Sequence, residues 1–181
     1  GHILTDWDLD PSERVENKCG DCDLCLKACP TGALEAPYRV NPKKCISYLT
    51  QTKDNIPEEL RRKMGIKLYG CDTCQLVCPK NKGIRKSCHE DFIPTITRGY
   101  MDLEELLQMS NRQFKEKYGH MAGSWRGKNT LKRNALIALA NMKKEENIKL
   151  ILPLLKDDNP MIREYAQWAI ENIFLTSLSK K

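Results

Sequence analysis

The chain has 181 residues, of which 40% are hydrophobic and 30% charged, and its formal net charge is +6. This composition is typical of a globular protein, not of a disordered one, and the length suits one ordinary domain or two small ones. The sequence has no apolar run of about 18 residues, which argues against a membrane-spanning helix. The positive charge is compatible with an anionic partner but does not identify its chemical class.

The first residues carry neither the basic start nor the apolar run of a signal peptide. The chain begins at Gly1 without a Met, so we expect a processed product or a fragment of a longer protein. Eight of the nine cysteines lie between Cys19 and Cys78. Without a secretory signal, this density favours metal ligation over disulfides and a cytoplasmic location.

The first cysteine run has the spacing C-x2-C-x2-C-x3-C-P, which is typical of cubane iron–sulfur clusters. Its members are Cys19, Cys22, Cys25, Cys29 and Pro30. Three thiolates two residues apart let a tight loop wrap three irons of one cube, and the fourth points away to the other cluster. Zinc needs only paired C-x2-C units, so zinc and disulfides are the weaker alternatives.

The second run, Cys71, Cys74 and Cys78 followed by Pro79, lacks one thiol, and Cys45 upstream can supply it. The pseudo-twofold arrangement of two-cluster ferredoxins then predicts the partition of two 4Fe–4S clusters. Cluster 1 is assigned Cys19, Cys22, Cys25 and Cys78, and cluster 2 is assigned Cys29, Cys45, Cys71 and Cys74. The ninth cysteine, Cys88, is interpreted as a free or partly buried thiol, with a functional role as the alternative.

Short strands or turns are expected directly after each run, from Thr31 and from Lys80. Residues 46–70 form an insertion between cluster ligands, with a helix predicted from Pro57 to Met64. A simple electron carrier has no need of this insertion. It therefore indicates a site built beside a cluster.

The rest of the chain is predicted to be helical after a linker at residues 94–99. Helices are expected at 102–109, 111–118 (capped near Ser110 or Asn111), 129–142, 145–156 and 159–174. The first and third of the last three match at a separation of 31 residues, as in Ala135 and Ala166, which indicates a short HEAT-like repeat. The expected fold class is α+β, with a two-cluster ferredoxin-like domain at 1–95. A helical linker and HEAT-like repeat domain at 96–181 is expected to dock on it.

Residues 112–149 carry ten Lys or Arg against three Glu, a net charge of +7 that exceeds that of the whole chain. A basic helical face with Trp125 in it is a candidate surface for a phosphate backbone. A merely solvated face explains the composition equally well. The three histidines are isolated. No hydrolase triad, phosphate loop or Rossmann fingerprint supports a hydrolase, a kinase or a nicotinamide enzyme.

Taken together, these motifs resemble the C-terminal half of the epoxyqueuosine reductases, the cobalamin-dependent iron–sulfur enzymes of tRNA queuosine biosynthesis. The resemblance covers nearly the whole chain. The cysteine runs are shared with many proteins, whereas the segment Cys45–Thr50 (CISYLT) and the helical tail after Trp125-Arg126-Gly127 are more specific. The opening Ile3–Asp6 (ILTD) and the segment Gly70–Pro79 also match.

The resemblance implies an oxidoreductase that reduces the epoxide of epoxyqueuosine in the tRNA anticodon loop to give queuosine. Electrons from an external donor would pass through both clusters to cobalamin, whose reduced cobalt attacks the substrate. The cobalamin domain of the family, with its catalytic acid, is expected upstream of Gly1. We further expect a monomer without membrane attachment.

The resemblance also implies that Ser47 and the backbone of Cys71 and Asp72 lie against the cobalamin, and that Gln51 and Lys53 lie near the tRNA. Charge and position suggest further phosphate contacts, at Arg126, Lys128, Lys132 and Arg133. Three other functions stay open. They are a plain two-cluster ferredoxin-type electron carrier, a corrinoid dehalogenase-like reductase, and a tRNA-docking module without the catalytic half.

Overall fold

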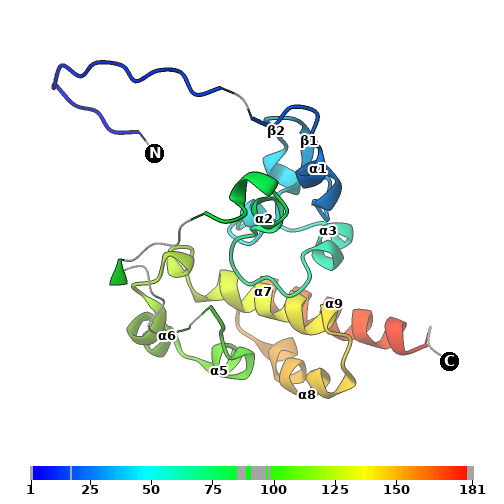
Figure 1. Ribbon diagram of the computed structural model, residues 1–181. Helices are drawn as coiled ribbons and strands as arrows, with labels where there is room; N and C mark the ends of the chain where they lie inside the picture. Colours follow the sequence, from blue (N-terminus) through cyan, green and yellow to red (C-terminus); the bar gives the residue numbers. More distant parts are fainter. Residues whose placement is uncertain (1, 17, 85–88, 91–96, 98, 179–181) are drawn as a thin grey trace.

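The computed structural model describes residues 2–16, 18–84, 89, 90, 97 and 99–178. It is mostly helical, with one small two-stranded sheet near the cysteine runs (Figure 1). Residues 2–16 form an exposed arm without regular secondary structure. Cys88 and most of the linker expected at 94–99 lie outside the described residues.

The cysteine-rich part is built from short elements. These are α1 (Leu24–Ala28), β1 (Leu34–Ala36), β2 (Arg39–Val40), the 3-10 turn η1 (Pro42–Lys44), α2 (Ile46–Leu49), α3 (Glu58–Lys63), α4 (Thr73–Leu76) and η2 (Pro79–Asn81). β1 and β2 pair antiparallel, with Leu34 opposite Val40 and Ala36 opposite Arg39. The expected strands after the first run and the expected helix near 57–64 are therefore both present.

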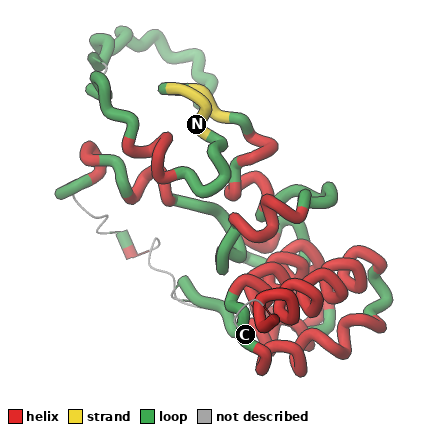
Figure 2. Tube along the Cα trace, turned by 90° about the vertical axis from the view of Figure 1, so that its right-hand side faces the viewer, coloured by secondary structure: helices red, strands yellow, loops and turns green. Residues whose placement is uncertain are grey.

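The helical tail follows. It contains α5 (Leu103–Gln108), α6 (Asn111–Tyr118), η4 (Ala122–Ser124), α7 (Lys128–Asn141), η5 (Glu145–Asn147), α8 (Ile148–Ile151), η6 (Leu152–Lys156) and α9 (Pro160–Leu178). Ser110 caps α6 in a capping box with Gln113, as its sequence position suggested. α7 packs along α9, and Figure 2 shows the tail helices gathered at one end with the strands at the other. None of the described helices is both long and apolar enough to cross a membrane.

One predicted helix is wrong in part. The stretch 145–156 is not a single α-helix but a 3-10 turn, one α-helical turn and a second 3-10 turn. Pro153 has no backbone N–H to donate, so a continuous α-helical ladder cannot pass through it. Leu152, an apolar residue at the start of the second 3-10 turn, is 50% exposed.

The hydrophobic core runs without a break from the insertion into the tail. Ile56 and Met64 from the segment between the cysteine runs belong to the same buried cluster as Leu136, Tyr165 and Ile173. Burial of these side chains contributes most of the stabilisation of this end of the molecule. The tail therefore packs directly on the insertion.

Candidate iron–sulfur site and neighbouring surface

The two cysteine runs fold into matching turns. In the first, Asp23 precedes α1, and its carbonyl accepts from the N–H of Lys27 at 3.1 Å; in the second, Asp72 precedes α4, and its carbonyl accepts from Leu76 at 2.9 Å. α1 and α4 lie against each other. The two runs are thus brought together as a local pair, which is the arrangement that the predicted exchange of ligands requires.

The thiols differ in exposure. Cys19 and Cys22 are exposed, and the other six described cysteines are half-buried. None of these eight forms a disulfide with another. Among the described residues, no group of three or more His, Cys, Asp or Glu side chains converges as a site for a single metal ion.

Cys29 lies in surroundings that favour its thiolate. Partial burial opposes ionisation, but the Thr31 hydroxyl and the backbone N–H groups of Thr31, Ala33 and Leu34 outweigh it and hold the thiol pKa below its ordinary value. The N–H of Ala33 donates to the sulfur at 3.3 Å. Because the thiolate is the metal ligand, this sulfur is suited to binding iron.

One cysteine of the second run, Cys71, has a similar neighbour. The Sγ of Cys71 lies 3.4 Å from the Thr73 hydroxyl, two residues later, just as Cys29 lies 3.6 Å from Thr31. Both sulfurs, assigned to cluster 2, therefore have a threonine hydroxyl within reach. The donor set fits iron–sulfur ligation in chemistry and in its paired arrangement.

Thr50 joins the two segments expected to face the cobalamin. Its hydroxyl donates to the carbonyl of Ser47 at 2.9 Å and accepts from the N–H of Gly70 at 3.0 Å, immediately before Cys71. The structure therefore brings Ser47 close to the Cys71–Asp72 turn, across an insertion of more than twenty residues. Ser47 is half-buried and Asp72 is exposed, so part of this junction is open to solvent.

Gln51 connects this region to the helical tail. Its amide donates to the Ser47 carbonyl at 2.9 Å, and its side-chain oxygen accepts from the indole N–H of Trp125 at 3.1 Å. The Arg126 guanidinium stacks on the Trp125 ring, 3.8 Å from its centroid, and Trp125 is 60% exposed. An exposed aromatic ring stacked with arginine is a surface on which an unpaired base can stack.

A hollow next to this stack is lined by three of the residues expected near the tRNA. Lys53, Arg126 and Lys128 line it together. The Lys128 ammonium donates to the carbonyl of Met109 at 2.8 Å, and burial together with nearby Lys132 lowers its pKa. The Nε of Arg126 is buried and has no hydrogen-bond partner within the described chain.

The expectation that Lys132 and Arg133 present charge to solvent is wrong. Lys132 is 6% exposed and pairs with Asp157 at 2.6 Å. Arg133 is fully buried and donates to the carbonyls of Thr52 at 2.6 Å and Leu49 at 2.9 Å. Both side chains hold the fold together and are not retained as phosphate contacts.

Sequence reasoning missed two residues that shape the site, Thr50 and Asn134. Asn134 is fully buried, and its amide donates to the carbonyls of Thr50 at 2.7 Å and Leu68 at 2.8 Å. A polar residue on the otherwise apolar face of the predicted helix at 129–142 was the available signal. Its partners, 66 and 84 residues away, could not be read from the sequence.

Comparison with known proteins agrees with this geometry. Residues 18–81 match the family model described as a 4Fe-4S double cluster binding domain. The epoxyqueuosine reductase of Bacillus subtilis is 48% identical over 172 residues, covering 94% of this chain and 45% of that protein. Over nearly its whole length, the chain is homologous to about half of an epoxyqueuosine reductase.

Two further relatives define the extent of the match. A crystal structure of epoxyqueuosine reductase with an epoxyqueuosine-modified tRNA-Tyr stem loop superposes with a TM-score of 0.86 at 49% identity, covering 91% of this chain and 44% of that one. An uncharacterised protein from the gldA 3′ region of Geobacillus stearothermophilus is 47% identical, covering 96% of this chain and 81% of that protein. The chain thus spans a little under half the length of the named epoxyqueuosine reductases.

Proposed function

We propose that this chain is the electron-transferring and tRNA-contacting part of an enzyme that reduces epoxyqueuosine in tRNA to queuosine. The observation that carries the proposal is the 48% identity to a named epoxyqueuosine reductase across both cysteine runs, the insertion and the tail. A solved relative in complex with an epoxyqueuosine-modified tRNA stem loop supports a tRNA substrate.

In this proposal the eight cysteines hold two 4Fe–4S clusters in the crossed arrangement. Cluster 1 has Cys19, Cys22, Cys25 and Cys78 as ligands, and cluster 2 has Cys29, Cys45, Cys71 and Cys74. The clusters supply one-electron transfer across the paired turns α1 and α4. The protein fixes their distance through the contact between those turns and lowers the pKa of at least one ligand thiol.

The residues next to cluster 2 suit a large cofactor placed against them. Ser47 and the Cys71–Asp72 turn, held together by Thr50, offer a hydroxyl and backbone groups on one side. Cobalamin, when bound, would supply the low-valent cobalt that attacks the epoxide. This chain's own part is to orient that face and to keep cluster 2 beside it.

The tRNA would lie across Gln51, Lys53, Trp125, Arg126 and Lys128. These side chains come from the insertion and from the start of α7, and the hydrogen bond between Gln51 and Trp125 joins the two. We further propose the division at residue 95, with α7 and α9 as a HEAT-like pair that presents Arg126 and Lys128. A plain electron carrier has no use for this joined surface, which favours the tRNA-modifying enzyme.

Genetic complementation tests the activity. The gene that encodes this chain is expressed in a strain that lacks epoxyqueuosine reductase, and tRNA nucleosides are measured by mass spectrometry. Queuosine should reappear, and a Cys22→Ser variant should not restore it. Persistence of epoxyqueuosine with the unaltered gene, despite normal iron content of the protein, would contradict the proposal.

Binding to a modified tRNA-Tyr stem loop tests the surface separately. Lys53→Glu/Arg126→Glu should weaken binding and flatten the dependence of log K on log salt, because each lost phosphate contact removes about 0.9 from the slope. Lys63→Glu/Lys156→Glu is the matched control, since both lysines are exposed and neither lines the hollow at Lys53 and Arg126. If both double variants bound the stem loop with equal affinity, Lys53 and Arg126 would not be part of the tRNA interface.

A further inference from the structure

Cluster 1, as assigned above, faces outward more than cluster 2. Its ligands Cys19 and Cys22 are exposed, and no other described cysteine is. Cys71 of cluster 2 packs against the hydrophobic core shared by the insertion and the tail. Figure 1 shows α1, next to these exposed thiols, at the end of the molecule away from α8 and the tail. An electron arriving from solvent therefore meets cluster 1 first.

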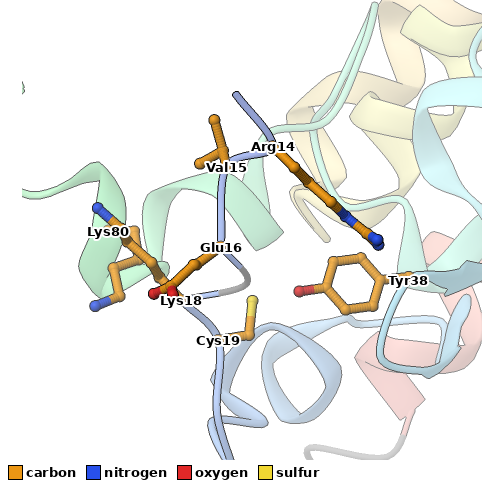
Figure 3. A pocket seen from close by; sticks show the side chains of 7 residues that line it. All are labelled: Arg14, Val15, Glu16, Lys18, Cys19, Tyr38 and Lys80. Atoms are coloured by element: carbon orange, nitrogen blue, oxygen red, sulfur yellow. The ribbon is translucent and has the colours of Figure 1, made fainter. Parts of the chain in front are cut away.

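A surface hollow opens directly beside Cys19. Its lining includes Arg14 of the arm, Lys18, Tyr38 and Lys80. Figure 3 shows Tyr38 with its hydroxyl end directed toward the middle of the hollow, near Cys19. Tyr38 has a φ of 61°, a left-handed conformation that is uncommon for an aromatic residue and that sets the direction of the tight β1–β2 turn.

The hollow is positively charged. Arg14, Lys18 and Lys80 are exposed, and none of them forms an ion pair with another residue in the part of the chain that the structure describes. Glu16 is the acidic residue in its lining. In the nearby loop, Asp23 is paired with Lys27 at 2.8 Å, which leaves Asp21 as the other acidic group of this run. Among the residues that line the hollow, three cations thus face one anion.

We propose that this hollow is the docking site of an acidic one-electron carrier protein that reduces cluster 1. The inference rests on the proposed cluster assignment. In each encounter the carrier loses one electron and cluster 1 gains it, with no bond made or broken. Complementary charge raises the encounter rate of such transient complexes, which bury little surface and must separate quickly. The unpaired lysines and arginine beside an exposed ligand suit that requirement.

The test measures reduction of the holoprotein, with both clusters assembled, by a reduced flavodoxin of net negative charge. Lys18→Glu/Lys80→Glu should lower the second-order rate of cluster bleaching about tenfold at low ionic strength and raise the Kd of the complex in calorimetry. High salt should remove most of the difference. Reduction by photoreduced deazaflavin, a small neutral reductant, should not change.

The matched control is Lys115→Glu/Lys149→Glu, which makes the same change of net charge on α6 and α8 at two exposed lysines. If both pairs bind and react with flavodoxin alike, the docking site is wrong. If the Lys18→Glu/Lys80→Glu variant loses iron, Arg14→Glu, on the arm outside the cysteine motifs, tests the docking site in its place. This variant should slow reduction by flavodoxin at least threefold. Normal docking and cluster reduction without queuosine formation would instead contradict the proposed activity, so the two failures are distinguishable.

Discussion

Buried polar side chains hold in place the insertion that precedes Cys71. Thr50, Arg133 and Asn134 together satisfy backbone groups at residues 47, 49, 50, 52, 68 and 70. Irregular backbone that is buried must find hydrogen-bond partners, and here the helix α7 supplies them from its side chains. The geometry next to the cluster thus depends on residues that touch no cofactor.

Replacing Arg133 with Met should destabilise the protein strongly. The change leaves two buried carbonyls, at Leu49 and Thr52, without their donor, and each such group costs about 1–3 kcal/mol. We expect the free energy of unfolding to fall by about 3 kcal/mol in urea titrations monitored by circular dichroism. Arg112→Met, at an exposed pair with Glu116, is the control and should change it by less than about 1 kcal/mol. A change no larger than the control would show that the buried guanidinium is not needed.

Replacing Cys45 with Ser should remove one cluster and spare the other. Cys45 is assigned to cluster 2 alone, so iron should fall from about eight to about four atoms per chain after anaerobic reconstitution. The same loss is expected for Cys22→Ser, which affects cluster 1. Equal disappearance of both clusters in Cys45→Ser, with circular dichroism unchanged, would contradict the partition.

The cysteine sites could be predicted from sequence because their spacing is local. The distance between Cys19, Cys22 and Cys25 is fixed by a turn of a few residues, so the pattern itself carries the chemistry. Arg133 could not be predicted, because its partners lie 81 and 84 residues earlier. A basic residue on a helix is predicted to be exposed unless the packing of distant segments is known.

At the scale of elements, periodicity predicted the helices well wherever one face is apolar over several turns. α5, α6, α7 and α9 lie within a few residues of their expected bounds, although α9 continues beyond the expected end at Phe174. The single helix predicted at 145–156 is wrong because the interpretation gave the apolar residues of this stretch more weight than Pro153. The pairing of α7 with the segment before α9 depends on a buried ion pair, which no periodicity reveals.

The Lys132–Asp157 pair should couple these elements energetically. Burial raises the pKa of Asp157, but hydrogen bonds from Lys132 and from the N–H of Asn159, with the charge of Lys132, outweigh it and leave the pKa below its usual value. A depressed carboxyl pKa stabilises the fold above the unfolded-state pKa of about 3.9, and that stabilisation is lost as the pH falls through the folded-state value. It is therefore fully present at neutral pH.

A double-mutant cycle with Lys132→Met and Asp157→Asn measures this coupling. We expect an interaction free energy of about 2 kcal/mol that is the same at about pH 7 and about pH 5, since both lie above the unfolded-state pKa. Lys144 and Glu146, an exposed pair at 3.3 Å, provide the control cycle and should give less than about 1 kcal/mol. Additive single-mutant effects for Lys132 and Asp157 would show that the contact contributes nothing.

At the scale of the molecule, the cluster-bearing part and the tail share one core. Tyr165 of α9 is a clear link, because its hydroxyl accepts from the N–H of Ile56 at 2.8 Å and donates to Asn55 at 2.9 Å. The Arg61 guanidinium lies over the same ring, 3.9 Å from its centroid, and pairs with Glu164 at 2.9 Å. Buried polar contacts and apolar packing thus both hold the insertion against α9.

These contacts between the insertion and α9 predict that the insertion and the tail unfold together. Tyr165→Phe should lower the free energy of unfolding by about 1–3 kcal/mol, because it leaves the buried N–H of Ile56 without an acceptor. In urea, the loss of cluster absorbance and the loss of helical circular dichroism should shift by the same amount, as expected for a single cooperative unit. Tyr100→Phe, at a side chain that is 84% exposed, is the control and should shift neither signal. If Tyr165→Phe moved the helical transition while the cluster signal stayed in place, the shared core would not couple the two parts.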